Sequence, residues 1–327
     1  MANQILNWGL LSTARINRAL VPPLRVSRRN RLVAVASRSA EHAEAYAREW
    51  KIPRSFGSYQ AMLDDPDIHV IYNSLPNHLH AEWTIKAAQA GKHVLCEKPI
   101  ALTVAELDAM AAAANEAGVV VTEAFMYRHH DQALKVKELV QSGVIGDLRL
   151  IRGHFTYNIG PADVRLDPAM GGGSIWDIGC YPISYARYIV DAEPLEVFGW
   201  QVTGPTGIDD VFAGQMRFPG GVLAQFESSF RSTFRSWLEI VGSHRSIEIP
   251  HPYKHEARPT IHLWDGRDIE KITIRGSELY LGEVEDMADA VLLGKPPHIS
   301  LADSRGNIAA IVALLQSAST NQPVQVT

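Results

Sequence analysis

The sequence predicts an α/β protein built from two different parts. The first 124 residues alternate short apolar strands with helices about five times, which is typical of a doubly wound, mostly parallel sheet. Beyond Gln132, strand-like segments follow one another directly, which is typical of an antiparallel sheet. We therefore expect a parallel-sheet domain over residues 1–124 and an α+β domain with a large open antiparallel sheet over residues 125–299. A last helix, at about residues 300–319, is expected to pack back on the first domain.

The composition is that of a globular protein with a substantial core. Of 327 residues, 46% are hydrophobic and 20% are charged, and the formal net charge is −5. This charge argues against a general binder of nucleic acid or anionic membranes, although local basic patches are compatible with it. No apolar run approaches a membrane span, and the first strand begins by Ile5, so no signal peptide is expected. Two cysteines give neither a disulfide framework nor zinc spacing, and we expect a cytoplasmic protein.

The first strand, residues 5–11, runs into a turn that is typical of dinucleotide-binding (Rossmann-type) sheets, but its glycine fingerprint is degraded. Gly9 holds the first glycine position, Leu11 stands at the second, and Ala14 takes the third, where alanine is tolerated. A merely structural turn is an equally good interpretation. A helix N-terminus near this turn would receive a pyrophosphate through its N–H groups. The residues that we expect there are Gly9, Ser12, Thr13, Ala14, Arg15 and Ile16.

The second strand, residues 31–36, ends in Ser37 and Arg38. NAD-specific folds carry an acid at this place for the ribose 2′-hydroxyl, whereas an arginine suits a 2′-phosphate. Ser37 would add a hydroxyl contact. An exposed arginine before a helix capped by Ser39 is the alternative interpretation. The pattern favours NADP over NAD, with NAD still possible.

Two further strands of the first part end in polar segments. Residues 69–74 lead into residues 75–80, and residues 94–96 lead into Glu97, Lys98 and Pro99. Open α/β sheets bind ligands at the carboxyl ends of their strands, so we expect both segments at the cofactor. A solvated Glu–Lys pair at a strand end is the alternative. The side chains predicted to contact the cofactor here are those of Ser74, Leu75, Asn77, His80, Glu97 and Lys98.

Histidines occur in two pairs, His78 with His80 and His129 with His130. No third and fourth ligand of suitable spacing accompanies either pair, so we expect no metal site. His80 is instead expected to begin the helix that follows this loop.

The second part opens with a helix at residues 133–142 and a long strand at residues 148–158. Three glycines at residues 171–173 then precede a helix over roughly residues 175–190. Turn signals such as Phe218-Pro219-Gly220-Gly221 mark hairpins. The strand-like segments expected after that helix are residues 197–202, 210–218, 221–230, 236–242 and 246–249, followed by helices at about residues 278–293 and 300–319.

The helix after the three glycines carries Asp177, Gly179 and Tyr181. Asp177 and Tyr181 are four residues apart, so both are expected on one helix face, with Gly179 leaving space for a ligand. A tyrosine acts as general acid/base only if its pKa of about 10 is lowered, which a nearby ammonium achieves. Lys98 would supply that charge if the two domains face each other. A half-buried Asp–Tyr pair on a core helix is the alternative.

Together these motifs resemble the glucose-fructose oxidoreductase / inositol dehydrogenase / MocA family of NAD(P)-dependent sugar oxidoreductases, over essentially the whole chain. Leu11 departs from the usual second glycine of that family, and Tyr181 stands where many members have histidine. Tyrosine there is similar to the dimeric dihydrodiol dehydrogenases, xylose/glucose 1-dehydrogenases and glucose-fructose oxidoreductase, relatives that mostly use NADP. The segments that carry the resemblance are Trp8-Gly9, Ser37-Arg38, residues 75–80, 91–99 and 123–128, and residues 171–173 with Asp177-Ile178-Gly179.

The resemblance implies an NADP-dependent oxidoreductase that transfers hydride between nicotinamide and the carbinol of a sugar or related polyol, in the manner of an aldose 1-dehydrogenase. Tyr181 would take the carbinol proton, Lys98 would bind the same oxygen and keep Tyr181 partly ionised, and Asp177 would orient the sugar or the lysine. The expected substrate contacts are Lys98, Arg128, Asn158, Asp177 and Tyr181, with Arg187 as a further one.

Three other functions stay open. They are a dehydrogenase for trans-dihydrodiols or other cyclic diols, a ketosugar reductase, and a non-catalytic regulator that binds NADP(H) or a sugar. The antiparallel sheet is expected to form a homodimer or higher homo-oligomer by burying its open face. Neither nucleic acid nor membrane is an expected partner.

Overall fold

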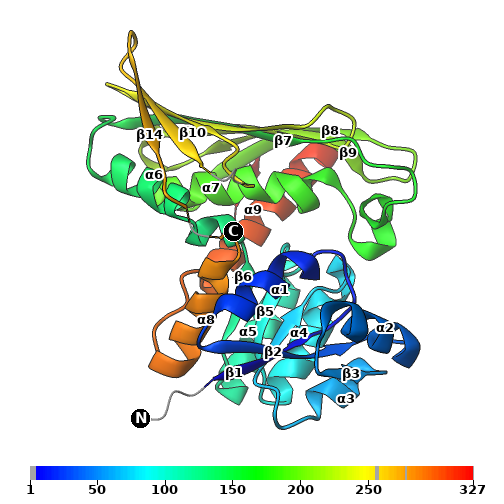
Figure 1. Ribbon diagram of the computed structural model, residues 1–327. Coiled ribbons are helices and arrows are strands. Elements are labelled where there is room, and N and C mark those ends of the chain that lie inside the picture. The colour runs from blue at the N-terminus through cyan, green and yellow to red at the C-terminus, as the bar shows by residue number, and fades with distance from the viewer. Residues whose placement is uncertain (1–4, 255–257, 277, 327) are drawn as a thin grey trace. The chain divides into compact units, whose positions relative to one another are not determined.

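The computed structural model describes residues 5–254, 258–276 and 278–326, and the chain divides into two compact units (Figure 1). Unit 1 comprises Met1–Met126 and Tyr280–Arg305, and unit 2 comprises Tyr127–Leu279 and Gly306–Thr327. The first boundary lies two residues after the predicted residue 124. The later boundaries differ from the prediction, because residues 280–299 belong to unit 1 and the chain from Gly306 onward belongs to unit 2.

Unit 1 is a doubly wound parallel sheet in the order β3-β2-β1-β4-β5-β6, as predicted. The order runs outward from β1 in both directions, so right-handed crossovers place α1 and α2 on one face and α4 and α5 on the other. The strands are β1 (Leu6–Leu10), β2 (Asn30–Ala36), β3 (Arg54–Phe56), β4 (Val70–Asn73), β5 (His93–Glu97) and β6 (Val121–Ala124). The helices are α1 (Asn17–Val26), α2 (Ala40–Trp50), α3 (Tyr59–Leu63), α4 (His80–Gln89), α5 (Val104–Ala117) and α8 (Leu281–Leu293).

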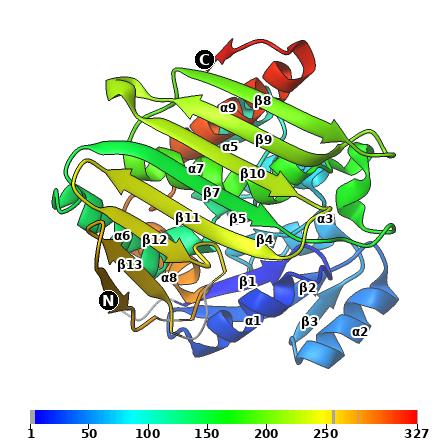
Figure 2. The same ribbon diagram turned by 90° about the horizontal axis from the view of Figure 1, so that it is seen from above.

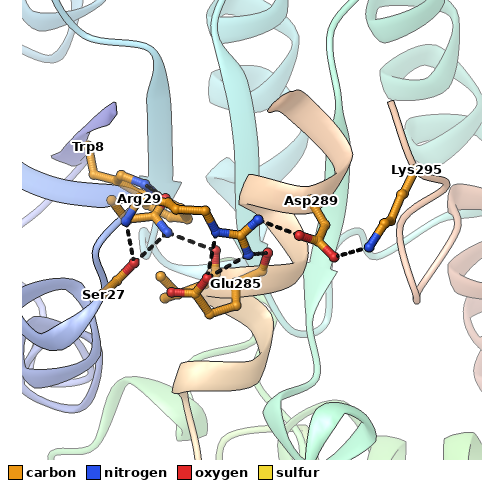
Figure 3. A network of polar contacts seen from close by, with 8 residues as sticks. Trp8, Ser27, Arg29, Glu285, Asp289 and Lys295 are labelled. Carbon is orange, nitrogen blue, oxygen red and sulfur yellow. Dashed lines mark hydrogen bonds and ion pairs between the residues drawn. The ribbon is translucent and has the colours of Figure 1, made fainter. Parts of the chain in front are cut away.

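A polar network explains why α8 belongs to unit 1 (Figure 3). Arg29 donates from Nε to Glu285 Oε2 at 2.9 Å and also pairs with Asp289. Lys295 Nζ lies 2.7 Å from the second carboxylate oxygen of Asp289. Hydrogen bonds from Lys295 and Arg29 lower the pKa of Asp289. The Arg29 contacts join residues 256 and 260 positions apart, so no local pattern shows them.

Unit 2 is a nine-stranded sheet in the order β14-β13-β12-β11-β7-β10-β9-β8-β15. It is mixed and largely antiparallel, and the pair β7–β10 is parallel, which the sequence did not predict. The strands are β7 (Leu148–Thr156), β8 (Glu196–Thr203), β9 (Asp209–Arg217), β10 (Leu223–Ser229), β11 (Arg235–Gly242), β12 (Ser246–Pro250), β13 (Thr260–Trp264), β14 (Ile269–Thr273) and β15 (Val324–Gln325).

The helices of unit 2 lie on one face of this sheet, as Figures 1 and 2 both show. They are α6 (Asp131–Gln141), α7 (Cys180–Val190) and α9 (Leu301–Thr320), of which α9 begins in unit 1. In the part of the chain that the structure describes, no helix is long and apolar enough to cross a membrane.

Close contacts in α9 explain why its larger part lies with unit 2. A Cβ on Gly306 would lie 2.3 Å from Glu193 Oε1 and 2.4 Å from Arg187 Nη2, so the helix backbone approaches this ion pair closely. Further along, the Ser317 hydroxyl accepts a hydrogen bond from the Gly199 N–H at 3.1 Å. Gly306 thus lets α9 approach the Arg187–Glu193 ion pair, and Gly199 lets β8 approach α9 at Leu314.

Candidate active site

The turn after β1 is longer than predicted, because α1 begins at Asn17 rather than near Ser12. A Cβ on Gly9 would lie 2.8 Å from Met62 Sδ, so this glycine serves packing. Leu11, at the second glycine position, is fully buried and donates its N–H to the Tyr72 carbonyl at 2.9 Å. The degraded fingerprint therefore reflects a turn whose hydrophobic side chain lies in the core.

Serine and asparagine side chains brace this turn. Ser12 Oγ lies 2.8 Å from Ser74 Oγ, and the Ser74 hydroxyl donates to Asn17 Oδ1 at 2.6 Å. Asn17 Nδ2 donates in turn to the Ser12 carbonyl at 2.8 Å, and the Ala14 N–H donates to Ser12 Oγ at 3.0 Å. Asn17 was not predicted, since its position at the helix start gives no distinctive motif. These side chains shape the turn.

The same turn leaves backbone donors available to a ligand. Within the described residues, the N–H groups of Thr13, Arg15 and Ile16 have no hydrogen-bond acceptor. Unpaired N–H groups at a helix start are the usual donors to phosphate oxygens. The geometry therefore fits a pyrophosphate bound by the main chain.

Arg38 lies just past the end of β2, in an exposed position beside the Tyr59 hydroxyl. Burial raises the pKa of Tyr59 above 10, while the Arg38 charge and hydrogen bond act in the opposite direction. Over the described ranges, no carboxylate lies within ion-pair distance of Arg38. Ser37 is buried and accepts from the Ser39 N–H at 3.4 Å. An arginine with no carboxylate partner at this strand end suits a 2′-phosphate.

His80 begins α4, as predicted, and connects two loops. Its Nδ1 lies 2.8 Å from the Pro99 carbonyl oxygen and its Nε2 lies 2.7 Å from the Leu75 carbonyl oxygen. Burial lowers the pKa of His80 to about 4, although both carbonyl contacts raise it. The imidazole thus ties the loop after β4 to the segment after β5. Asn77 lies between these points, in a short 3-10 turn at Asn77–Leu79.

Glu97 and Lys98 lie at the carboxyl end of β5, as the strand pattern predicts. The buried Tyr72 hydroxyl donates to Glu97 Oε1, and the Lys98 N–H donates to Glu97 Oε2 at 3.2 Å. Burial, followed by the Glu97 charge, raises the pKa of Tyr72 well above 10. Glu97 is therefore held within the sheet edge, next to the half-buried Lys98.

In unit 2, Gly172 and Gly173 leave no room for a Cβ, and Gly171 has a positive φ of +76°. A Cβ on Gly172 would lie 2.4 Å from the Arg165 carbonyl oxygen. Gly173 has a φ of +130°, and a Cβ there would lie 2.3 Å from Asp209 Oδ1. Asp209 Oδ2 accepts from the Ser174 hydroxyl and from the Ile175 N–H, both at 2.7 Å. Burial raises the pKa of Asp209 to about 6, although these hydrogen bonds lower it.

The predicted helix at residues 175–190 begins differently in the structure. Ile175–Gly179 form a π-helical turn, and the regular helix α7 starts at Cys180. Single π turns inside helices are often found at functional sites. Asp177 therefore lies on the wider turn and Tyr181 in the first turn of α7, so the simple four-residue spacing of an α-helix does not describe the pair.

The Asp177 carboxylate is held by two donors. Tyr157 donates its hydroxyl to Asp177 Oδ2, and Arg165 Nε lies 2.9 Å from the same oxygen. Burial and the Asp177 charge raise the pKa of Tyr157, so that this tyrosine stays protonated as a donor. Arg165 was not predicted as a site residue; it lies in the loop of residues 161–170, which has no periodic pattern.

Tyr181 is only 3% exposed and lies among aromatic rings of unit 2. Its ring centroid is 5.5 Å from those of Phe155 and Tyr253 and 5.8 Å from that of Tyr127. Such tilted ring contacts fix the orientation of a phenol. Tyr127 and Tyr253 were not predicted as site residues, and both are fully buried, as is Phe155.

The other predicted substrate contacts lie in different settings. Arg128 is buried, with its guanidinium carbon 4.0 Å from the centroid of the Tyr188 ring. Asn158 is exposed, two residues after β7. Arg187 donates from Nε to Glu193 Oε2 at 2.6 Å in a two-pronged ion pair. Within the described ranges, no group of three or more His, Cys, Asp or Glu side chains is suited to a metal ion.

The fold and these two sets of side chains define a dinucleotide-binding oxidoreductase. Residues 6–125 match the model of an oxidoreductase family with an NAD-binding Rossmann fold, and residues 133–248 match the GFO/IDH/MocA C-terminal domain. The chain belongs to the GFO/IDH/MocA oxidoreductase family, as its motifs indicated.

Three similar proteins extend over most or all of the chain. D-xylose 1-dehydrogenase (NADP(+)) 2 of Haloferax volcanii is 33% identical over 325 residues, covering 97% of this chain and 99% of its own. Trans-1,2-dihydrobenzene-1,2-diol dehydrogenase of Xenopus laevis is 30% identical over 310 residues, covering 91% and 93%. The crystal structure of aldose-aldose oxidoreductase from Caulobacter crescentus complexed with glycerol has a TM-score of 0.92 at 26% identity, covering 98% and 100%.

Proposed function

We propose that this protein is an NADP-dependent oxidoreductase that transfers hydride between the nicotinamide and a carbinol carbon of a sugar or related polyol. One observation carries the proposal: a carboxylate held by Arg165, that of Asp177, lies four residues before Tyr181, whose ring is oriented by aromatic neighbours. The similarity to a xylose dehydrogenase over the whole chain supports the same reaction class.

The residues at the carboxyl edge of unit 1 fit NADP. The N–H groups of Thr13, Arg15 and Ile16 suit the pyrophosphate. Arg38, with Ser37 beside it, suits the 2′-phosphate. The other predicted contacts, from Ser74 to Glu97, lie at the ends of β4 and β5, where parallel sheets bind such ligands. When bound, the nicotinamide accepts or supplies the hydride.

In this proposal, Tyr181 takes the proton of the carbinol hydroxyl, and the Lys98 ammonium binds the same oxygen. The positive charge favours the phenolate form of the tyrosine, which makes it a usable base at neutral pH. Asp177 orients the sugar or the lysine. Because Arg165 and Tyr157 both bind one of its oxygens, Asp177 is presented in a fixed orientation.

Arg128 and Asn158 remain proposed substrate contacts, and Arg187 is left out because Glu193 already pairs with its guanidinium. Phe234 is 57% exposed and lies edge-on to Phe155, so its ring suits a sugar face, whereas Phe155 itself is buried. The same exposed ring suits a cyclic diol, and the similarity to a dihydrodiol dehydrogenase supports that second candidate substrate.

The test is NADP reduction by the full chain with a panel of aldoses, polyols and a trans-dihydrodiol, beside a thermal-shift titration with NADPH. Reduction of NADP by an aldose or polyol supports the proposal, and reduction by the diol alone selects the second candidate. Stabilisation by NADPH without turnover on any member of the panel would show a binding protein instead.

We also propose a homodimer through the open face of the nine-stranded sheet. Trp200, Val202 and Leu223 are 55%, 50% and 46% exposed in strands of this sheet. Trp200 and Val202 are neighbours on one face of β8, and Leu223 lies two strands away, next to Arg217. Exposed apolar side chains that lie together on an open sheet face are a candidate interface. Sedimentation at micromolar concentration should give a dimer that Trp200→Glu converts to a monomer; a monomeric native chain would refute the proposal.

A further inference from the structure

A cavity in unit 1 lies at the opposite edge of the parallel sheet from the turn after β1. It has a volume of about 370 Å³ and lies where β1 and β2 begin. β1 has 5 residues, so the cavity lies roughly 15 Å from that turn at about 3.3 Å per residue. Its lining consists of Ile5, Leu24, Arg25, Ser27, Arg28, Asn30, Arg31, Leu32, Lys51 and Pro53.

Among the described residues, the lining carries four cationic side chains and no carboxylate. Arg25 donates to the Trp50 carbonyl, while Arg28, Arg31 and Lys51 are exposed and have no ion pair within the described residues. Arg29, in the same run of sequence, provides an internal contrast, because its guanidinium reaches Glu285 and Asp289 (Figure 3). Arg28, Arg31 and Lys51 therefore differ from Arg29, whose charge is neutralised by two carboxylates.

Helix ends account for only part of this charge. α1 ends at Val26 and α2 at Trp50, and each helix C-terminus is equivalent to about −0.5 charge, so the two supply roughly one negative charge. Since the four cations face roughly one negative charge from the helix ends, a surplus of about three positive charges remains around this small cavity. Like charges gathered without a partner repel one another, and an anion with two or three charges would remove that repulsion.

We propose that this cavity binds a small molecule that carries a phosphate or pyrophosphate group on an apolar body. Arginine guanidinium groups pair with phosphate oxygens in a two-pronged geometry. The apolar side chains of Ile5, Leu24 and Leu32 would contact the rest of the molecule. The proposal does not rest on the proposed function, because it requires neither turnover nor NADP.

The experiment is calorimetric titration of the full chain with phenyl phosphate, with and without saturating NADP. Phenyl phosphate is expected to bind in both conditions and to bind less tightly as salt is raised. The double variant Arg28→Gln/Arg31→Gln should lose at least about tenfold in affinity, which is the loss of one charged contact. A charge-matched control, Arg149→Gln/Arg267→Gln, alters exposed arginines of unit 2 and should bind as the native chain does.

Three results would overturn the proposal: no binding at millimolar phenyl phosphate, displacement by NADP, or native affinity in the double variant. Inorganic phosphate and phenol are titrated in parallel. If inorganic phosphate binds as tightly as phenyl phosphate, the cavity does not recognise an apolar body. If phenol binds as tightly as phenyl phosphate, the cavity does not recognise a phosphate group.

Discussion

The two units hold their functional segments by different means. In unit 1, hydrogen bonds brace the loops: Ser12 with Ser74 at the first turn, and His80 with the Pro99 carbonyl, next to Lys98. In unit 2, a charged pair, Arg165 with Asp177, fixes the segment of Asp177 and Tyr181. In the proposed function this difference has a purpose. The loops of unit 1 would present main-chain donors to a cofactor, whereas the charged pair and the rings of unit 2 would orient side chains for proton transfer.

Substitution of the two proposed catalytic side chains is expected to have the largest effect, a loss of kcat. Tyr181→Phe and Lys98→Met should each lower kcat by about 10²–10⁴, because each removes part of the proton transfer. NADP affinity, measured by fluorescence titration, should stay near the native value for Tyr181→Phe.

Tyr185 provides the matched control. It lies one helical turn after Tyr181, is fully buried, and its hydroxyl has no hydrogen-bond partner in the described part of the chain. Tyr185→Phe should therefore leave kcat unchanged. An equal loss of activity in both phenylalanine variants would show that packing rather than proton transfer is affected.

The next largest effects are expected from glycine substitutions, and the loss of stability should be greater in unit 2 than in unit 1. Gly173→Ala combines a positive φ with a contact to the Asp209 carboxylate, so we expect a loss of about 4 kcal/mol in the free energy of unfolding. In unit 1, the Cβ of Gly9→Ala meets the end of the flexible Met62 side chain and touches Ile68 at 3.4 Å, so the substitution should cost about 1 kcal/mol. Urea unfolding measures both.

Gly207→Ala separates the cost of a positive φ from the cost of a steric clash of the added Cβ. Gly207 has a φ of +93° but nothing within 4 Å of an added Cβ, so only the backbone term applies. We expect a loss of about 1–2 kcal/mol. If Gly207→Ala costs as much as Gly173→Ala, the Asp209 contact contributes nothing.

The pH dependence of stability should have opposite signs in the two units. His80 has a pKa of about 4 when folded, below the ordinary 6.5, so the folded chain binds fewer protons between these values. The contribution of neutral His80 to the free energy of unfolding is complete above pH 6.5. It is lost as the pH falls to about 4, by up to about 3 kcal/mol. Asp209, with a pKa of about 6 against 3.8, binds more protons when folded, and its contribution rises as the pH falls from 6.

Urea unfolding between pH 4.5 and 7.5 tests both signs. His80→Gln should reduce the loss of stability on acidification, and Asp209→Asn should increase it. The exposed His78→Gln serves as control and should leave the profile unchanged. A steeper acid loss in His80→Gln would contradict the assignment.

The smallest expected effect concerns cofactor choice. Arg38→Ala removes one exposed charge near the proposed 2′-phosphate, so KM for NADP should rise about tenfold while KM for NAD stays unchanged. Equal effects on both cofactors would show that Arg38 acts on the fold of the loop.

Periodic segments of the chain were predictable, and contacts between distant segments were not. The capping box of Thr103 and Glu106 and the start of α4 at His80 follow from local sequence, and both occur. The π turn at Ile175–Gly179 does not, since the same residues also suit an α-helix. The assignment of α8 to unit 1 depends on Arg29, some 250 residues away, and no pattern shows that pairing.

The site follows the same rule. Lys98, Asp177 and Tyr181 stand in short motifs whose position at a strand end or after three glycines is visible in sequence. Arg165 and Asn17 act only through contacts with other segments, and neither has a motif. The strands β13 and β14 were missed for a related reason, because short strands at one edge of a sheet carry weak alternation.

The most direct test of the central claim, that Lys98 makes Tyr181 a usable base, is a double-mutant cycle on kcat. If the two act as one unit, Lys98→Met/Tyr181→Phe will be about as slow as the slower single variant, because losing either partner already removes the function of both. If the two losses instead multiply, Lys98 and Tyr181 act independently and the claim is wrong.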